Sequence, residues 1–341
     1  MLGLFFLPEK YYADVHTIRA FYGVYDEIRD PIGETFANTA EFYSLFGLNY
    51  LQNSFIEGLF TYSLFAGCMT WIINKFKFMI DLKKFWIMFI WNIPAAIYLG
   101  QLTKEIIPIL LLTVIIKILT TSMRGKSILI GALITAYAFL FRNYWFITLA
   151  WTLAIMSFIF IKSYSHKSNN KKVYFILRWA VLIISIISVF FTAQYQGFYI
   201  TDIRTHVNMN RENALDAVTL TKNIIENTSF ITDVANWLYI WTSLMVPVQF
   251  MLSQPFVLAA GVWNILNVRI FIHISRKLLN STRSLSIQVF FPIAWMISFS
   301  LTQGLFEPDY GSFLRHQTIL LPLYIFLVAQ AEFERENLER M

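Results

Sequence analysis

Long apolar runs separated by short polar stretches recur along nearly the whole chain. The runs from which we predict membrane spans cover 49–73, 85–101, 106–121, 128–141, 144–161, 173–192, 255–275, 287–306 and 318–331. A helix needs ~20 apolar residues to cross a bilayer, and unbroken runs favour helices over the alternating strands of a closed barrel. The pattern therefore predicts an all-α protein, a polytopic membrane helical bundle of about nine spans, with residues 1–341 forming a single integral membrane domain.

The longest interruption of this pattern is the polar stretch 193–235. The apolar segment that follows, 236–252, is short and contains Pro247. We interpret it as a re-entrant or interfacial helix, because so short a segment does not cross a bilayer in the ordinary way. Residues 193–254 are then one long loop on one side of the membrane.

Composition supports a membrane protein. Hydrophobic residues make up 57% of the 341 residues and charged residues only 14%, whereas a soluble domain is about one quarter charged. The net charge of +6 does not indicate nucleic acid as a partner, because the cations are spread through short loops beside apolar runs. The single cysteine, Cys68, lies inside an apolar run, where core packing explains it.

The distribution of Lys and Arg predicts the orientation. With loop 162–172 in the cytoplasm, fifteen of these cations fall in cytoplasmic segments and nine in the much longer outer segments. This orientation places 8–48, 193–254 and 307–317 on one external face. It also requires a span before residue 8, of which Leu2–Leu7 supplies only the last turns. We therefore expect a truncated start and a full count of ten spans. The short apolar segment at the start does not have the pattern of a cleavable signal peptide, so we expect none.

The segment between the last two runs is the strongest candidate for a functional site. Glu307, Asp309, Arg315 and His316 lie within ten residues at the expected membrane edge. Ionisable groups held between apolar spans are typical of chemistry or of anion binding. The alternative is a short loop with an internal ion pair and interfacial anchors.

A second candidate lies in the long loop. Arg204, His206 and Arg211 occur within 202–213, together with three asparagines. Guanidinium, imidazole and amide groups suit an anionic, hydroxyl-rich ligand. A polar surface loop of ordinary function has a similar composition, so both interpretations stay open.

Three further positions on the expected outer face are candidates for substrate binding. Arg142 lies between two spans with no room for a loop, and it either binds a phosphate or extends to the surface. Glu57, near the outer end of the first span beside Asn53, requires a partner, for which an outer arginine is the natural choice. Asp14, like Asn38, either caps a short interfacial helix or contributes to a substrate site.

Several signatures of other functions are missing from the sequence. It contains no P-loop, GxGxxG, HExxH, CxxC or GxSxG motif. The pair Asp26 and Asp30 is better explained as solvated charge than as a metal site. We therefore expect no cofactor and no metal.

Four segments carry a resemblance to a known family: FFLPEKYYADVHTI, FANTAEFYSLFGLN, VNMNRENALDAVT and FEPDYGSFLRHQTILLP. Together they resemble bacterial Wzy-type polymerases of O-antigen and capsule. The resemblance implies a GT-C-like fold in the bacterial inner membrane, with a long periplasmic loop and an active site facing the periplasm. It also implies polymerisation of undecaprenyl-diphosphate-linked oligosaccharide repeat units without a cofactor. The donor and the acceptor would both be lipid-linked and would lie in membrane lipid. A flippase and a chain-length regulator would be partners.

The resemblance directs attention to the residues with matching chemistry. Arginines that bind a departing lipid diphosphate would be Arg142, Arg204, Arg211 and Arg315. A general base for the acceptor hydroxyl would come from His206, His316, Glu307 or Asp309. Two other functions stay open: another GT-C glycosyltransferase or O-antigen ligase, and a transporter or flippase of lipid-linked sugars.

Overall fold

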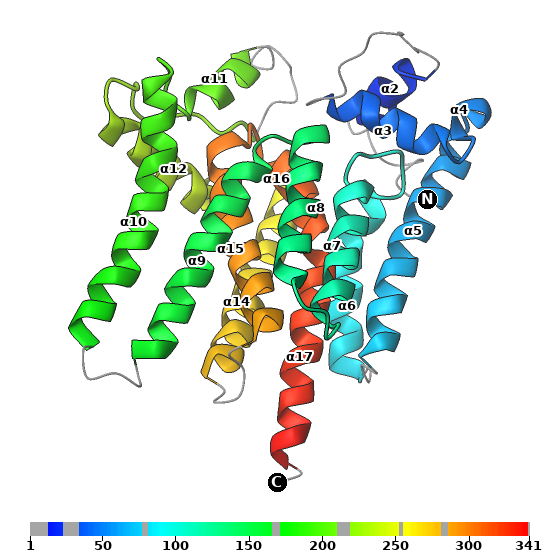
Figure 1. The fold of residues 1–341 in the computed structure, drawn as a ribbon. Coiled ribbons are helices and arrows are strands. Elements are labelled where there is room, and N and C mark those ends of the chain that lie inside the picture. The colour runs from blue at the N-terminus through cyan, green and yellow to red at the C-terminus, as the bar shows by residue number, and fades with distance from the viewer. Residues whose placement is uncertain are drawn as a thin grey trace. The chain divides into compact units, whose positions relative to one another are not determined.

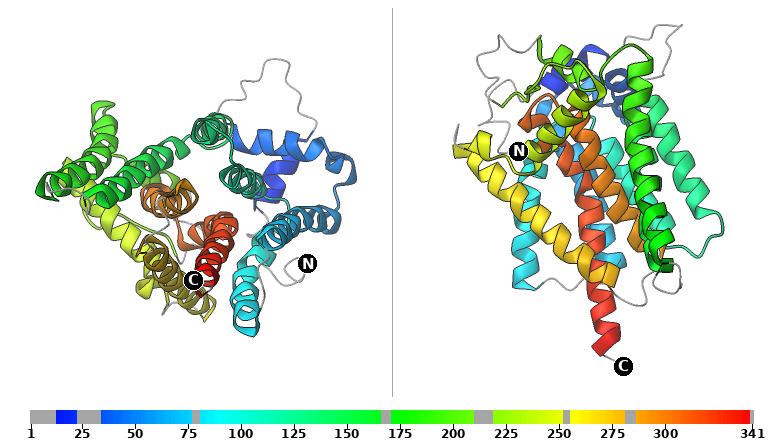
Figure 2. Two further views of the ribbon diagram at one scale, coloured as in Figure 1. Left: turned by 60° about the horizontal axis from the view of Figure 1, so that its bottom comes forward. Right: turned by 90° about the vertical axis from the view of Figure 1, so that its left-hand side faces the viewer.

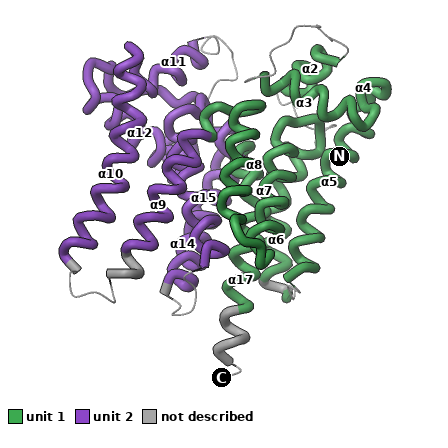
Figure 3. Tube along the Cα trace, in the orientation of Figure 1, with its two compact units in different colours: residues 1–145, 315–341 green, residues 146–314 purple. Residues whose placement is uncertain are grey.

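The helices of a computed structural model lie in two compact units. The structure describes residues 13–22, 34–76, 81–165, 171–209, 219–251, 255–280 and 286–339. Unit 1 comprises residues 1–145 and 315–341, and unit 2 comprises residues 146–314 (Figure 3). Among the described residues every regular element is a helix, and Leu220 and Asp309 form an isolated β-bridge. The prediction of an all-α protein is confirmed.

Unit 1 is built from the first part of the chain and its C-terminal helix (Figure 1). Its elements are α2 (Ala13–Ala20), α3 (Thr35–Ser44), α4 (Leu48–Leu51), α5 (Ser54–Lys75), α6 (Leu82–Tyr98), α7 (Ile106–Leu119), α8 (Lys126–Leu140), η2 (Thr318–Leu320) and α17 (Leu321–Glu339). Helix α17 packs against α5 and α7, so the last apolar run of the sequence is part of the core of this unit (Figure 2).

Local sequence sets where the helices of unit 1 begin. The side chain of Asn53 accepts hydrogen bonds from the backbone N–H groups of Phe55 and Ile56, at 3.0 and 3.3 Å, and so caps α5. Asp81 caps α6 by accepting a hydrogen bond of 2.8 Å from the backbone N–H of Lys84. Each cap satisfies donors that the first turn of a helix leaves without partners.

Unit 2 contains the remaining helices. They are α9 (Trp145–Ser165, from its second residue), α10 (Lys171–Tyr195), α11 (Asp202–Met209), α12 (Phe230–Met245), α13 (Val248–Met251), α14 (Pro255–Asn280) and α15 (Ile287–Phe306). Helix α16 (Tyr310–Gln317) belongs to unit 2 as far as Leu314. Trp151, Phe190, Trp237 and Leu305 form the centre of a buried apolar cluster shared by α9, α10, α12 and α15.

Five of the described helical stretches are long and apolar enough to cross a membrane. They are Ser54–Lys75, Lys172–Tyr195, Val257–Leu279, Ile287–Phe306 and Tyr310–Phe333. Ile106–Leu119, Lys126–Leu140 and Trp145–Ile161 are apolar but shorter. Every predicted span overlaps a helix of the structure, so the apolar pattern located the helices correctly.

The long loop 193–254 is itself largely helical. The helix predicted at 236–252 begins at Phe230 instead, after a capping box in which Ser229 and Thr232 exchange hydrogen bonds with each other's backbone N–H groups. It ends at Met245, and the short α13 follows Pro247. The polar capping pair, rather than the first apolar residue, therefore determines the start of α12.

Candidate functional site

The main concentration of buried charge in the described residues lies at one end of unit 1. Residues far apart in the sequence meet there: Asp14 of α2, Lys104 and Glu105 before α7, Arg142 after α8, and Arg315 and His316 of α16. We call these six residues the charged cluster. All six belong to unit 1.

Glu105 is the centre of the charged cluster. Its side chain has no exposed surface, and its Oε1 accepts a hydrogen bond of 2.7 Å from Nη2 of Arg142. Nε2 of His316 lies 3.2 Å from the same oxygen, and Nε of Arg315 lies 3.6 Å from it. Three cationic or ionisable groups thus share one carboxylate oxygen. The other oxygen, Oε2, has no hydrogen-bond partner in the described part of the chain.

Asp14 binds the cations on the more exposed side of the cluster. Its Oδ2 lies 2.9 Å from Nη1 of Arg315 and 3.7 Å from Nζ of Lys104. The ammonium group of Lys104 also lies over the ring of Phe36, 3.9 Å from its centroid, a cation–π contact. Arg315 therefore links both acids of the cluster, because it reaches Asp14 with one nitrogen and Glu105 with another.

The connection between α6 and α7 holds Lys104 and Glu105 in place. The hydroxyl of Tyr43 donates a 2.8 Å hydrogen bond to the carbonyl of Thr103 and accepts one of 3.2 Å from the Thr103 N–H. Gly58 of α5 lies directly against the backbone of Gly100, where an added Cβ would fall 2.8 Å from the carbonyl carbon. This short connection is therefore fixed by neighbours on α3 and α5.

Helices α2 and α3 lie at one end of unit 1 (Figure 3), and α2 carries Asp14 of the cluster. Arg19, in the last turn of α2, donates hydrogen bonds to both oxygens of Glu57, at 3.2 and 2.5 Å, and to the hydroxyl of Ser54 at 2.8 Å. The expectation that Glu57 has an arginine partner is confirmed. Asn38 of α3 donates a 2.5 Å hydrogen bond to the carbonyl of Leu140, at the end of α8. Glu57 and Asn38 thus have structural partners, whereas Asp14 belongs to the charged cluster.

Arg142 does not extend to the surface. Only 5% of the residue is exposed, and besides Glu105 its guanidinium group donates a 2.7 Å hydrogen bond to the hydroxyl of Tyr144. Arg315 is more accessible, with 22% of its side chain exposed, and Lys104 has 14%. An incoming ligand would therefore meet Arg315 and Lys104 before Arg142.

Burial and neighbouring charge act in opposite directions on Glu105. Desolvation by itself would raise the pKa of Glu105, but Arg142, His316 and Arg315 outweigh it and hold the pKa well below its usual value. Burial lowers the pKa of Lys104 to about 8; Asp14 opposes this shift, while Arg315 and Arg142 add to it. The acid is therefore firmly charged, and the lysine is the member of the pair that titrates near neutral pH.

The charged cluster contains more cations than anions. Two carboxylates face two guanidinium groups and one ammonium group, before any charge on His316 is counted. The more accessible cations of the cluster, Arg315 and Lys104, can attract an anion, and a phosphate suits Arg315 because a guanidinium group binds phosphate oxygens in pairs. The imidazole beside Glu105 adds a group that can accept a proton.

Glu307 and Asp309 lie in unit 2, at the end of α15 and the start of α16. Asp309 caps α16: its carboxylate accepts hydrogen bonds of 2.8 Å from the N–H of Ser312 and 3.0 Å from its hydroxyl. Glu307 is buried, 4% exposed, and its carbonyl accepts a 2.8 Å hydrogen bond from the hydroxyl of Thr221. The structure thus gives Asp309 a capping role; whether either acid takes part in chemistry stays a prediction.

Arg204 fixes the long loop of unit 2. It has no exposed surface and donates hydrogen bonds to the carbonyls of Gly304 and Leu305, at 3.0 and 3.3 Å, and to the side chain of Asn223. His206 lies on the exposed side of the same helix, α11. Arg211 lies outside the described residues. The assignment of Arg211 to the departing lipid diphosphate therefore stays a prediction.

A metal site finds no support in the described part of the chain, where no group of three or more His, Cys, Asp or Glu side chains is arranged to hold an ion. The pair Asp26 and Asp30 lies outside the described residues.

Sequence reasoning missed the central residue of the site. Lys104 and Glu105 stand side by side in a very short connection between two apolar runs and looked like ordinary loop charge. The available signal was the position of Glu105 directly before an apolar run, since a carboxylate at the edge of such a run must find a partner. Which partners it finds depends on contacts with residues at 142 and 315–316, which no local pattern indicates.

Comparisons with known proteins add no family. The chain matches no protein-family model, no curated protein and no solved structure. The structure gives a helical protein with several apolar helices that can cross a membrane. The chemistry of the site must therefore be inferred from its own residues.

Proposed function

We propose that the protein joins oligosaccharide repeat units carried on a lipid diphosphate into O-antigen or capsular polysaccharide, at the periplasmic face of the bacterial inner membrane. The observation that carries this proposal is the charged cluster, in which Arg142, Arg315 and His316 converge on Glu105 beside Lys104. The resemblance of four segments of the sequence to Wzy-type polymerases supports it. Substrates of that family combine a diphosphate, sugars and a long apolar tail.

In this proposal the apolar helices cross the bilayer, about nine times in all, in a GT-C-like arrangement. The ends of the unit 1 helices that bear α2, α3 and the charged cluster then face the periplasm. The distribution of Lys and Arg supports this orientation, because the loops expected on the opposite side are the most basic. A cluster at the end of apolar helices is suitably placed for a ligand whose head group is polar and whose tail lies in the membrane.

Arg315 and Lys104 are the groups that we assign to the diphosphate. Negative charge develops on this leaving group as the bond between the donor sugar and the diphosphate breaks. Fixed cations bind that growing charge more strongly than the initial state and so lower the barrier. Arg142 acts indirectly: its hydrogen bond holds Glu105, which in turn positions the nitrogen atoms of Arg315 and His316.

His316 is the general base that the geometry favours. In the proposed step the acceptor hydroxyl oxygen bonds to the anomeric carbon of the donor, the bond from that carbon to the diphosphate breaks, and the diphosphate leaves with the electron pair. The hydroxyl proton passes to the base. In this step the imidazole takes the proton, and the ionised Glu105, whose Oε1 lies 3.2 Å from Nε2 of His316, stabilises the imidazolium that results.

The test is polymer formation by purified protein supplied with a lipid-diphosphate repeat unit, with products separated by size. We expect a ladder of products from the native protein and at least a hundredfold lower rate from Arg315→Ala, because one fixed cation at a developing charge contributes roughly that much. Arg124→Ala is the matched control: Arg124 is an exposed cation of the same unit outside the cluster.

Each alternative predicts a different product. A single-step glycosyltransferase or a ligase would add one sugar or one finished chain and give no ladder. A flippase would move labelled lipid across a vesicle membrane without lengthening the sugar. A full ladder from Arg315→Ala at the native rate would refute the role of the cluster.

A further inference from the structure

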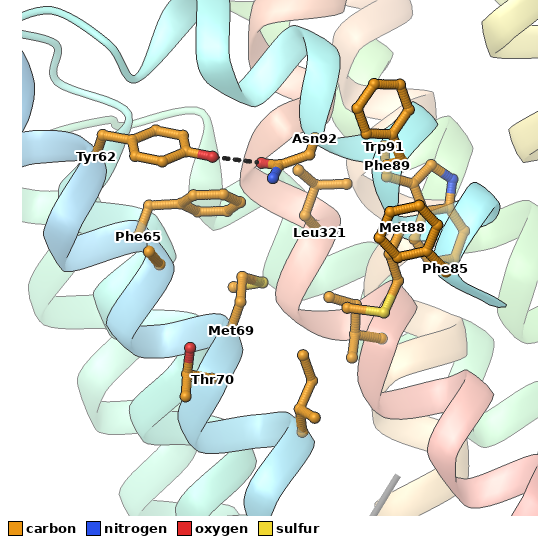
Figure 4. A pocket seen from close by; sticks show the side chains of 13 residues that line it. Tyr62, Phe65, Met69, Thr70, Phe85, Met88, Phe89, Trp91, Asn92 and Leu321 are labelled. Carbon is orange, nitrogen blue, oxygen red and sulfur yellow. Dashed lines mark hydrogen bonds between the residues drawn. The ribbon is translucent and has the colours of Figure 1, made fainter. Parts of the chain in front are cut away.

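A cavity of about 330 Å³ lies within unit 1, between α5, α6 and α17 (Figure 4). Its walls are mainly apolar and include Phe65, Met69, Met88, Trp91 and Leu321. On α5 it extends from Tyr62 to Ile73, about 16 Å along the helix axis at the usual rise per residue. We call this cavity the trough; it extends along α5, a helix that is expected to cross the membrane.

One end of the trough is marked by a polar pair. The hydroxyl of Tyr62 donates a 3.2 Å hydrogen bond to Oδ1 of Asn92, across the space between α5 and α6 (Figure 4). Asn92 is the only amide in α6, in which no charged residue follows Lys84. A polar residue inside a membrane helix is costly and is commonly retained for function. Both residues lie towards the N-terminus of α5 and the C-terminus of α6, which are the ends nearer the charged cluster.

The trough and the charged cluster share one continuous element. Helix α16, η2 and α17 follow one another without a break, so that Leu321 in the wall of the trough comes six residues after Arg315. At helical rises of about 1.5 to 2.0 Å per residue, these two positions are roughly 10 Å apart along the axis. A molecule with a charged head and a long apolar tail can therefore occupy both places at once.

We propose that this trough binds the proximal part of the polyprenyl tail of the lipid diphosphate whose head group occupies the charged cluster. This inference rests on the proposed function and assigns the tail to named residues. The cationic excess next to the trough favours a diphosphate lipid over the ordinary zwitterionic lipids of a bilayer. The flat walls of Phe65 and Trp91 and the flexible Met69 and Met88 suit a branched, unsaturated chain.

The test fills the trough without touching the charged cluster. Ala66→Phe places a ring in the trough, because Ala66 lines it. Gly67→Phe is the matched control: it adds the same ring to the next residue of α5, where a Cβ would meet nothing within 4 Å. The measurements are the affinities of the purified, detergent-solubilised variants for two probes, a long-chain polyprenyl diphosphate and inorganic pyrophosphate.

We expect Ala66→Phe to weaken polyprenyl diphosphate binding at least tenfold, about 1.4 kcal/mol, and to leave pyrophosphate binding unchanged. Gly67→Phe should change neither affinity. If Ala66→Phe does not fold, Thr70→Phe repeats the test farther along the trough.

Three outcomes would overturn the inference alone: native affinity of the filled variants for polyprenyl diphosphate, equal weakening of both probes, or displacement of the polyprenyl probe by phosphatidylglycerol at equal concentration. Native protein that binds neither probe would overturn the proposed function as well.

Discussion

Replacing Glu105 by glutamine tests whether one buried carboxylate holds the charged cluster together. Glutamine keeps the shape of the side chain and removes its charge. Arg142 would then remain buried beside a neutral amide, with Arg315 and His316 close to the same oxygen. The substitution therefore leaves several cationic groups facing one another with Asp14 as the remaining carboxylate of the cluster.

The expected cost follows from burial. The side chain of Glu105 has no exposed surface and that of Arg142 has 4%. Removing one partner of such a pair typically destabilises a protein by about 3 to 5 kcal/mol, because the other charge stays buried without compensation. We expect Glu105→Gln to lower the free energy of unfolding by that amount and to weaken pyrophosphate binding, since Arg315 and His316 lose the group that orients them.

Unfolding by denaturant in mixed micelles, followed by tryptophan fluorescence, measures this cost. The double variant Glu105→Gln, Arg142→Met completes a double-mutant cycle, and we expect a coupling energy of about 2 kcal/mol or more. Glu57→Gln is the matched control. Its carboxylate is equally buried, but its partner Arg19 has 24% of its side chain exposed, so water can solvate the cation that remains.

Two results would refute this reasoning. The first is a loss of less than about 1 kcal/mol in Glu105→Gln, which would mean that the cations of the cluster do not depend on the carboxylate. The second is simple addition of the two single costs in the double variant, since that would show no energetic link between Glu105 and Arg142.

The other predictions concern pH and packing. Because burial lowers the pKa of Lys104 to about 8, its ammonium group is charged below that pH and neutral above it. We expect the affinity for inorganic pyrophosphate to fall by up to about tenfold between pH 7 and pH 9. The fall should be smaller in Lys104→Arg, because the guanidinium group stays charged. An equal fall in the native protein and in Lys104→Arg would exclude Lys104 as a ligand. Gly58→Ala should lower the thermal unfolding temperature, because the added Cβ meets the backbone of Gly100. Gly67→Ala is the control and should leave that temperature unchanged. Equal unfolding temperatures of the two variants would contradict the close approach of α5 to the α6–α7 connection.

The helices could be predicted from the sequence because the signal is local. An apolar run of sufficient length forms a helix in a bilayer whatever lies elsewhere in the chain. The arginine partner of Glu57 was likewise foreseeable, because a buried carboxylate near the outer end of a span requires a cation. The start of α12 was missed because the apolar run gave 236, while the capping pair Ser229 and Thr232 starts the helix at Phe230.

The charged cluster could be predicted only in part. Arg142, Arg315 and His316 were recognisable as ionisable groups at the edges of apolar runs, and Asp14 as a candidate cap or substrate ligand of the expected outer face. Their meeting in one cluster was not recognisable, because it depends on packing between segments up to 301 positions apart in the sequence, as Asp14 and Arg315 are. For Arg204 the sequence indicated a ligand-binding cation, which stays a prediction; in the structure its guanidinium group donates hydrogen bonds to the end of α15.

The long separation of Asp14 from Arg315 has a consequence for biogenesis. A ribosome delivers Asp14, Lys104, Glu105 and Arg142 well before Arg315 and His316. Until α16 and α17 are made, Asp14 has Lys104 as its counter-ion among the described residues and Glu105 has Arg142. Completion of unit 1 is therefore tied to synthesis of the C-terminal segment, and a prematurely terminated chain would carry an unfinished core that quality-control proteases can recognise.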